Sequence, residues 1–142
     1  MTGFKALEIE DGVECIAVDL DGVLAKWGDL SMAEYRPDAI GEFVPVMVER
    51  IKRWLAQGKE VAIFTARVHP MHVEEAEIAR RAIEERCLKE FGKKLEVTCM
   101  KHPRMSEIWD DRAVTIERDT GRILTEGVKD DVDEPDAIGS LA

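Results

Sequence analysis

Two aspartates one residue apart follow an apolar run near the start of the chain. Asp19 and Asp21 come directly after Cys15-Ile16-Ala17-Val18, which predicts a short buried strand, and Gly22 follows them. Burying an unpaired carboxylate is so costly that the group tends to be neutralised, so this pair indicates a cation site or a proton-transfer role. The plainer interpretation is that the pair caps a turn before a helix. We favour chemistry because apolar residues resume at Val23, which is unusual for a surface turn.

Polar side chains also follow each of the later predicted strands. They are Thr65 and Arg67 after the run 60–65, Lys101 after 95–99, and Asp110 with Asp111 after the apolar stub 108–109. The carboxyl ends of parallel strands meet at one edge of a sheet, where ligands of α/β proteins bind. Carboxylates suit Mg²⁺, and a hydroxyl with a lysine could hold phosphate oxygens. The set therefore predicts Mg²⁺-assisted phosphoryl chemistry.

The elements that would position these residues alternate between strand and helix. The stretch 43–57 has apolar residues on one helical face, a proline suited to the first turn and Gly58 at the C-terminal cap position, and 71–91 has a second helical stripe ended by Gly92. This alternation predicts an α/β fold, a Rossmann-like three-layer sandwich with a mainly parallel central sheet. A weak strand is expected at 4–10.

Towards the C-terminus the pattern changes. Residues 113–117 and 123–125 flank Asp119-Thr120-Gly121, which predicts a small hairpin at the edge of the sheet. We expect residues 1–127 to form a single domain. We expect residues 128–142, which are acidic with little to bury, to form a flexible tail.

The composition is that of a soluble globular domain. The 142 residues carry a formal net charge of −10, which disfavours stable binding to nucleic acid through its phosphate backbone. We expect no membrane span and no signal peptide, and hence a cytoplasmic protein. The three cysteines lack metal-type spacing and lie in apolar patterns, so they are interpreted as core residues without disulfides.

In its motifs the chain resembles the haloacid dehalogenase-like (HAD) hydrolases. The family's first motif, a strand ending in Asp-x-Asp-Gly-x-[ThrVal], is matched by Asp19-Leu20-Asp21-Gly22-Val23. Its hydroxyl residue is matched by Thr65, its lysine by Lys101, and its acidic pair by Asp110-Asp111. The four motifs occur in the family's order between about residues 15 and 116, so the resemblance covers most of the chain.

The resemblance implies a phosphatase with a role for each matched residue. Asp19 would be the nucleophile that forms an aspartyl-phosphate, and Asp21 the general acid and base. Thr65 and Lys101 would orient and neutralise the phosphoryl group. Mg²⁺ would be held by the Asp19 carboxylate, the backbone carbonyl of Asp21 and one carboxylate of the acidic pair. The alignment favours Asp111 as the direct ligand, with Asp110 behind it or sharing the role.

The spacing of the motifs implies the minimal branch of that family. Only about forty residues separate Asp21 from Thr65, and a helix takes up a good part of them, so a separate cap domain has no room. Capless relatives tend to admit large substrates or to close the site by oligomerising. A homo-oligomer is therefore one expectation for this chain.

Some neighbouring residues have two interpretations. His69 and His72 suggest a metal site, but two histidines without further ligands are more often loop and helix-cap residues. Arg67 could clamp a substrate phosphate or carboxylate. Arg104 and His102, beside Lys101, have a weaker claim to the same role. The aromatic residues of the irregular segment 26–40, Trp27 and Tyr35, could stack on a base or cover the core.

Two function classes follow from these residues. The first is an Mg²⁺-dependent phosphomonoester hydrolase, for which the intact Asp21 speaks, because relatives that are not phosphatases can lack it. The second is a non-catalytic module on the same fold that binds a phosphorylated ligand or nucleotide. Within the enzyme class, a nucleotide or polynucleotide-end phosphatase competes with a sugar or small-metabolite phosphatase.

Overall fold

The computed structural model describes residues 13–28, 34–130 and 132. The chain divides into two compact units, Met1–Asp111 and Arg112–Ala142, which are described separately. The proposed candidate site lies wholly within the first unit. The strand expected at 4–10 and most of the tail after residue 130 lie outside the described residues.

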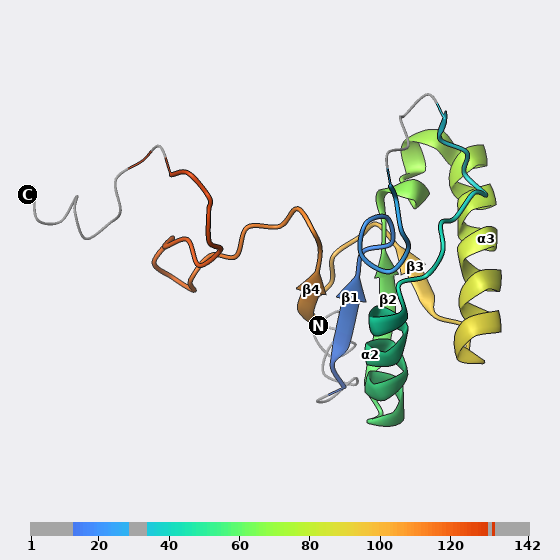
Figure 1. Ribbon diagram of the computed structural model, residues 1–142, viewed down its shortest axis with the longest axis horizontal. Helices are drawn as coiled ribbons and strands as arrows, with labels where there is room; N and C mark the ends of the chain where they lie inside the picture. The colour runs from blue at the N-terminus through green and yellow to red at the C-terminus, as the bar shows by residue number, and fades with distance from the viewer. Residues whose placement is uncertain (1–12, 29–33, 131, 133–142) are drawn as a thin grey trace, which may run out of the picture. The chain divides into compact units, whose positions relative to one another are not determined.

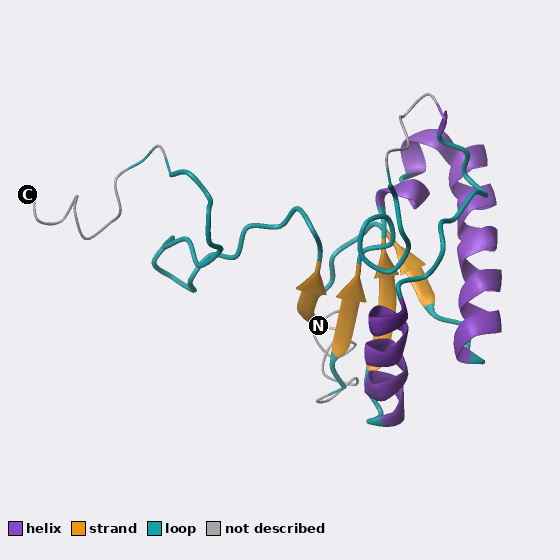
Figure 2. Cartoon of the chain, viewed as in Figure 1, coloured by secondary structure: helices purple, strands orange, loops and turns teal. Residues whose placement is uncertain are grey.

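A parallel four-stranded sheet forms the centre of the first unit. Its order is β3-β2-β1-β4, and all four arrows point the same way (Figures 1 and 2). The strands are β1 (Cys15–Val18), β2 (Glu60–Phe64), β3 (Glu96–Thr98) and β4 (Met105–Trp109). The predicted α/β class with a parallel sheet is thus confirmed. The predicted strands fall within a residue or two of these bounds, except that β4 begins at Met105, earlier than expected.

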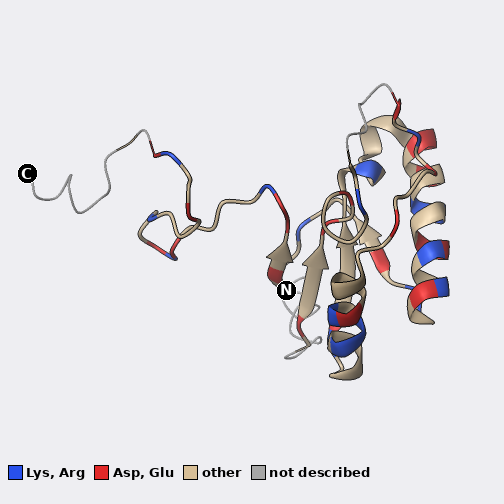
Figure 3. Cartoon of the chain, in the orientation of Figure 1, with Lys and Arg blue, Asp and Glu red and all other residues tan. Residues whose placement is uncertain are grey.

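In the part of the chain that the structure describes, two α-helices connect the strands. Helix α2 (Pro45–Ala56) buries Met47 and Ile51, and helix α3 (Val73–Phe91) buries Ala76, Ala79, Ile83 and Cys87. Two 3₁₀ turns, η2 (Ala66–Val68) and η3 (Pro70–His72), lie between β2 and α3. Both α2 and α3 carry acidic and basic residues (Figure 3). No described helix is long and apolar enough to cross a membrane.

Both helices lie on one face of the sheet. The connections β1-α2-β2 and β2-α3-β3 step in the same direction across the sheet, so right-handed crossovers place both helices on the same side. The segment 99–104 connects β3 back to β4 at the far edge and is too short to form a helix of ordinary length. The described residues therefore form two layers, and the third layer of the predicted sandwich is not found among them.

Side chains alternate between the two faces of the sheet. Ile16, Val18, Val61, Ile63 and Val97 belong to the core cluster that includes the buried residues of both helices. On the other face, Cys15, Ala17 and Ala62 are also almost fully buried but lie outside that cluster. Something other than the helices must therefore cover this second face.

The cysteines agree with the prediction that they form no disulfide. Cys15 and Cys87 are buried and free, and Cys99 is half-buried. Burial raises the pKa of the Cys15 thiol to about 11 and that of Cys87 to about 12, so both are neutral thiols at physiological pH.

The predicted hairpin is smaller than expected. Within the second unit, one antiparallel bridge joins Ile116 to Ile123, and the turn between them places Asp119 at a φ of 67°. Glu117 and Arg122 form an ion pair of 2.6 Å across this turn. Neither segment is one of the four strands of the sheet, so the expected edge hairpin is wrong in that respect. Its residues are mostly exposed, and little apolar surface is buried to extend the pairing.

Candidate functional site

A tight loop follows β1 and holds the first aspartate at the end of the sheet. The backbone N–H of Asp19 donates to the carbonyl of Trp109, so the ends of β1 and β4 are joined there. The Leu20 N–H donates to Asp19 Oδ1 at 2.9 Å. The loop then closes on itself, because Gly22 N donates to Ala25 O and Ala25 N to Leu20 O, both at 2.8 Å.

Three carboxylates converge beside this loop. One oxygen from each of Asp19, Asp110 and Asp111 lies within 4.8 Å of the other two. Gly22 has a φ of +89°, and a Cβ atom built on it would lie 2.8 Å from Asp111 Oδ2. Glycine is therefore favoured by the backbone conformation, and an added Cβ would also displace the Asp111 carboxylate. The structure brings together three of the four acidic residues that the sequence assigned to a metal, including both members of the pair. Asp21, which was assigned through its backbone carbonyl, is not a member of this carboxylate group.

The electrostatics of Asp19 reflect this crowding. Its pKa is raised to about 7, first by burial and next by the charge of Asp110. The charges of Asp111 and Asp21 add to the rise, and the hydrogen bond from the Leu20 N–H opposes it. Like charges held close together disfavour ionisation, and a bound cation would reverse that effect.

Asp21 is held by a different partner. Arg67 donates from Nε to Asp21 Oδ2 and from Nη2 to Asp21 Oδ1, both at 2.8 Å. The Arg67 side chain is 5% exposed and that of Asp21 is 22% exposed, so this bidentate ion pair is largely shielded from water. Thr65 is buried after β2, and its Oγ1 accepts a 3.2 Å hydrogen bond from the Arg67 N–H. Thr65 and Arg67 thus position each other beside Asp21.

The remaining Arg67 donor, Nη1, faces the irregular segment before α2. It lies 2.8 Å from the carbonyl of Ala39, with the carbonyls of Pro37 and Arg36 at 3.3 and 3.4 Å. The guanidinium also packs on the rings of Tyr35 and Trp27, at 5.0 and 5.7 Å from their centroids.

All three guanidinium nitrogens of Arg67 therefore donate within the protein. A substrate contact, as the sequence suggested, would require Arg67 to give up some of these bonds. Arg67 instead links Asp21 to the segment 34–40, a role that its sequence position did not predict. No local pattern signals this role, because the partners lie about thirty and forty-six positions away.

The other candidate residues are spread more widely. Lys101 is exposed in the β3–β4 connection, and its ammonium has no hydrogen bond or ion pair among the described residues. Arg104 in the same connection donates to Glu60 at 2.7 Å. His69 Nδ1 accepts from the Met71 N–H and so caps η3, in agreement with the plainer interpretation of that histidine. Neither His69 nor His72 belongs to a potential metal-ligand group in the described part of the chain.

Comparison of the chain with family models, with curated proteins and with solved structures finds no match.

Proposed function

We propose that this chain is an Mg²⁺-dependent phosphomonoester hydrolase of the HAD type, without a cap domain, that acts through an aspartyl-phosphate on Asp19. The observation that carries the proposal is the convergence of Asp19, Asp110 and Asp111 beside an ion-paired Asp21 at the carboxyl end of a parallel sheet. This is the edge at which α/β proteins bind ligands.

The residues present fit a hard divalent cation. All the donors of the acidic cluster are carboxylate oxygens, which Mg²⁺ prefers, and they leave positions for water and for substrate phosphate. Burial, and after it the charge of Asp110, raises the pKa of Asp19, and a bound cation would offset the cost of that ionised carboxylate. When bound, Mg²⁺ would polarise the phosphoryl group and neutralise the charge that develops on it.

The protein's own residues would divide the reaction into two steps. In the first, an oxygen of Asp19 attacks phosphorus, the ester oxygen leaves, and Asp21 gives that oxygen a proton. In the second, Asp21 takes a proton from a water molecule that attacks phosphorus and releases Asp19. Arg67 would orient Asp21 throughout, since each carboxylate oxygen that accepts from the guanidinium keeps a second lone pair.

Two further residues would bind the transferring group. The Thr65 hydroxyl accepts from the Arg67 N–H, which leaves its hydrogen to donate to a phosphoryl oxygen. Lys101 carries an ammonium group without a partner among the described residues, and it would neutralise phosphoryl charge.

One observation favours the second candidate function, a non-catalytic module that binds a phosphorylated ligand or nucleotide. Both oxygens of Asp21 are engaged by Arg67, so the carboxylate that would move the proton is also a structural ion pair. In such a module Asp21 would only hold the segment 34–40 through Arg67, and no turnover would occur.

Two substrate classes are proposed, a nucleotide or polynucleotide end and a sugar or small-metabolite phosphate. The rings of Trp27 and Tyr35, whose centroids lie 6.5 Å apart beside Arg67, favour a nucleotide or polynucleotide end. The net charge of −10 favours a sugar or small metabolite over a polynucleotide.

The test is phosphate release from a panel of nucleotides, sugar phosphates and end-phosphorylated oligonucleotides, with Mg²⁺ or with a chelator. We expect Mg²⁺-dependent turnover that is lost in Asp19→Asn and Asp21→Asn but kept in Glu49→Gln, a control on the exposed side of α2. Ligand binding without turnover, unchanged by Asp21→Asn, would instead support the non-catalytic module. Turnover that Asp19→Asn leaves intact would refute the proposed mechanism.

A further inference from the structure

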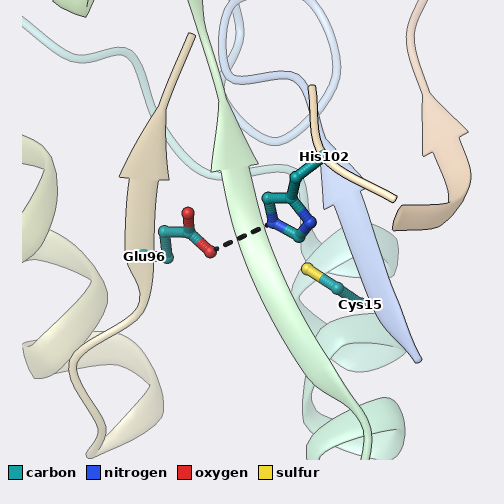
Figure 4. Close-up of side chains that lie close together, drawn as sticks. All are labelled: Cys15, Glu96 and His102. Carbon is teal, nitrogen blue, oxygen red and sulfur yellow. Dashed lines mark ion pairs between the residues drawn. The ribbon is translucent and has the colours of Figure 1, made fainter. Parts of the chain in front are cut away.

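A second group of potential metal ligands lies on the sheet face opposite the helices. It consists of Cys15 at the start of β1, Glu96 at the start of β3 and His102 in the β3–β4 connection. One ligand atom from each lies within 4.8 Å of the other two. Figure 4 shows the three side chains pointing toward one another across β2.

His102 carries the observation that points to a ligand. Both of its ring nitrogens are inaccessible to solvent, and neither has a hydrogen-bond partner in the described part of the chain. Buried polar groups are almost always satisfied, so two orphaned nitrogens on one ring require an explanation such as a bound ion or water. Glu96 Oε1 makes an ion-pair contact of 3.6 Å with Nε2, which is longer than a hydrogen bond.

That separation matches two ligands of one metal ion. Zinc binds nitrogen and oxygen ligands at about 2.0–2.2 Å in a tetrahedral arrangement, which places two such atoms about 3.4 Å apart. The distance between His102 Nε2 and Glu96 Oε1 is close to this value. A thiolate from Cys15 would complete three protein ligands and leave a fourth position for water.

The sheet provides the space for this group. Strand register places Ala17 beside Ala62 and Ala62 beside Glu96, so all three residues project from the same face as Cys15. The two alanines are short and fully buried, so they leave room for an imidazole above the sheet. The connection 99–104 must return from β3 to β4 across this face, and it brings His102 there.

The ligand types indicate the class of metal. Thiolate, imidazole and carboxylate together suit a borderline-soft ion such as Zn²⁺, and not Mg²⁺, which takes oxygen ligands. The group is also separate from the acidic cluster, because Cys15 and Asp19 lie about 13 Å apart along β1. The two sites would therefore bind different metals at opposite ends of the same strand.

We propose that Cys15, Glu96 and His102 form a Zn²⁺ site that fastens the β3–β4 connection to the sheet. The proposal does not depend on the proposed phosphatase function. Bound metal would give His102 Nε2 a ligand bond in place of its 3.6 Å ion-pair contact with Glu96. It would also link β1 to β3 and to the connection that follows β3.

The test uses the full chain after metal has been removed with a chelator. Zn²⁺ affinity is measured by competition with a chromophoric chelator, and Co²⁺ is used as a spectroscopic probe of thiolate ligation. We expect near-stoichiometric binding and a thiolate-to-cobalt absorption band. Cys15→Ser should abolish the band. His102→Gln and Glu96→Gln should weaken Zn²⁺ binding by more than the roughly 10- to 100-fold that loss of an outer hydrogen-bond partner costs.

Matched controls separate this site from the rest of the molecule. Cys99→Ser, in the same connection, and Asp111→Asn, in the acidic cluster, should keep the cobalt band and the Zn²⁺ affinity. Cys15 is buried and its variant could fail to fold, whereas the Glu96 and His102 side chains are 45% and 24% exposed, so those variants decide the matter. Absence of the band in the wild-type protein, or Zn²⁺ binding that both His102→Gln and Glu96→Gln leave intact, would overturn the proposal.

Discussion

The crowding of carboxylates around Asp19 predicts that removing its charge stabilises the protein. Substitution Asp19→Asn keeps an oxygen that can accept the hydrogen bond from the Leu20 N–H. It removes the charge that burial and the neighbouring Asp110 disfavour. In the absence of divalent cations we therefore expect the variant to unfold at a higher urea concentration than the wild-type protein at pH 8.

The size of the effect follows from the pKa of Asp19. The rise from 3.8 to about 7 corresponds to about 4 kcal/mol at about 1.4 kcal/mol per pKa unit. The carboxylate is partly exposed, so solvent screening reduces this to about 2 kcal/mol.

The sign and the pH window follow from proton binding. The folded state holds the Asp19 proton more tightly than the unfolded state, so the contribution of Asp19 to wild-type stability falls as pH rises from about 4 to about 7. Below this window Asp19 is protonated in both states and does not lower the free energy of unfolding. Above the window its charge lowers that free energy by the full amount. The stability difference between Asp19→Asn and wild type should therefore grow through this window and then level off.

The assay is urea unfolding at several pH values between 4 and 8 with a chelator present. All three tryptophans, Trp27, Trp54 and Trp109, lie in the first unit, so their fluorescence reports on the unit that holds the site. Glu49→Gln controls for the loss of one exposed negative charge. If the stabilities of wild type and Asp19→Asn changed with pH in parallel, or if the variant were less stable than wild type at pH 8, the reasoning would be refuted.

Two further changes test the geometry of the site. Arg67→Ala should lower the free energy of unfolding in urea by about 3 kcal/mol, because it leaves the shielded Asp21 carboxylate unpaired. Arg81→Ala, which removes an exposed ion pair with Glu77, should lower it by less than about 0.5 kcal/mol. An equal cost for both would contradict the assigned role of Arg67. Gly22→Ala should lower the free energy of unfolding more than Gly58→Ala does. Both glycines have a positive φ, but only at Gly22 would the added Cβ meet Asp111. Equal losses of stability would show that this contact is not tight.

Much of the fold could be predicted because its strands and helices have clear periodicity. Strand β1 has the bounds that its apolar run predicts, since all four residues are buried. Strand β4 was predicted too short, because Ser106 and Glu107 are polar and exposed at the sheet edge. There the strand is set by backbone pairing with β1, which side-chain patterns do not report.

The candidate site was predictable to the extent that it depends on strand ends. Asp19 and Asp111 follow adjacent parallel strands, so their convergence could be expected from topology. The hydrogen bonds from Arg67 to the backbone of the segment 34–40 could not be predicted, because they depend on how that segment folds back over η2. The sequence placed a cation two residues after Thr65 but carried no information about which acceptors it would reach.

The connection 99–104 joins the two proposed sites and shows why the second was missed. Spacing rules for metal sites look for several ligands close in sequence, whereas Cys15 lies about eighty positions before Glu96 and meets Glu96 and His102 only through strand order and a return of the chain across one face. The residue before His102 is Lys101, the proposed phosphoryl ligand. A metal that fixes His102 would therefore restrict the backbone that carries Lys101, because adjacent Cα atoms are about 3.8 Å apart. If both proposals hold, removing Zn²⁺ should weaken substrate binding while leaving the acidic cluster unchanged.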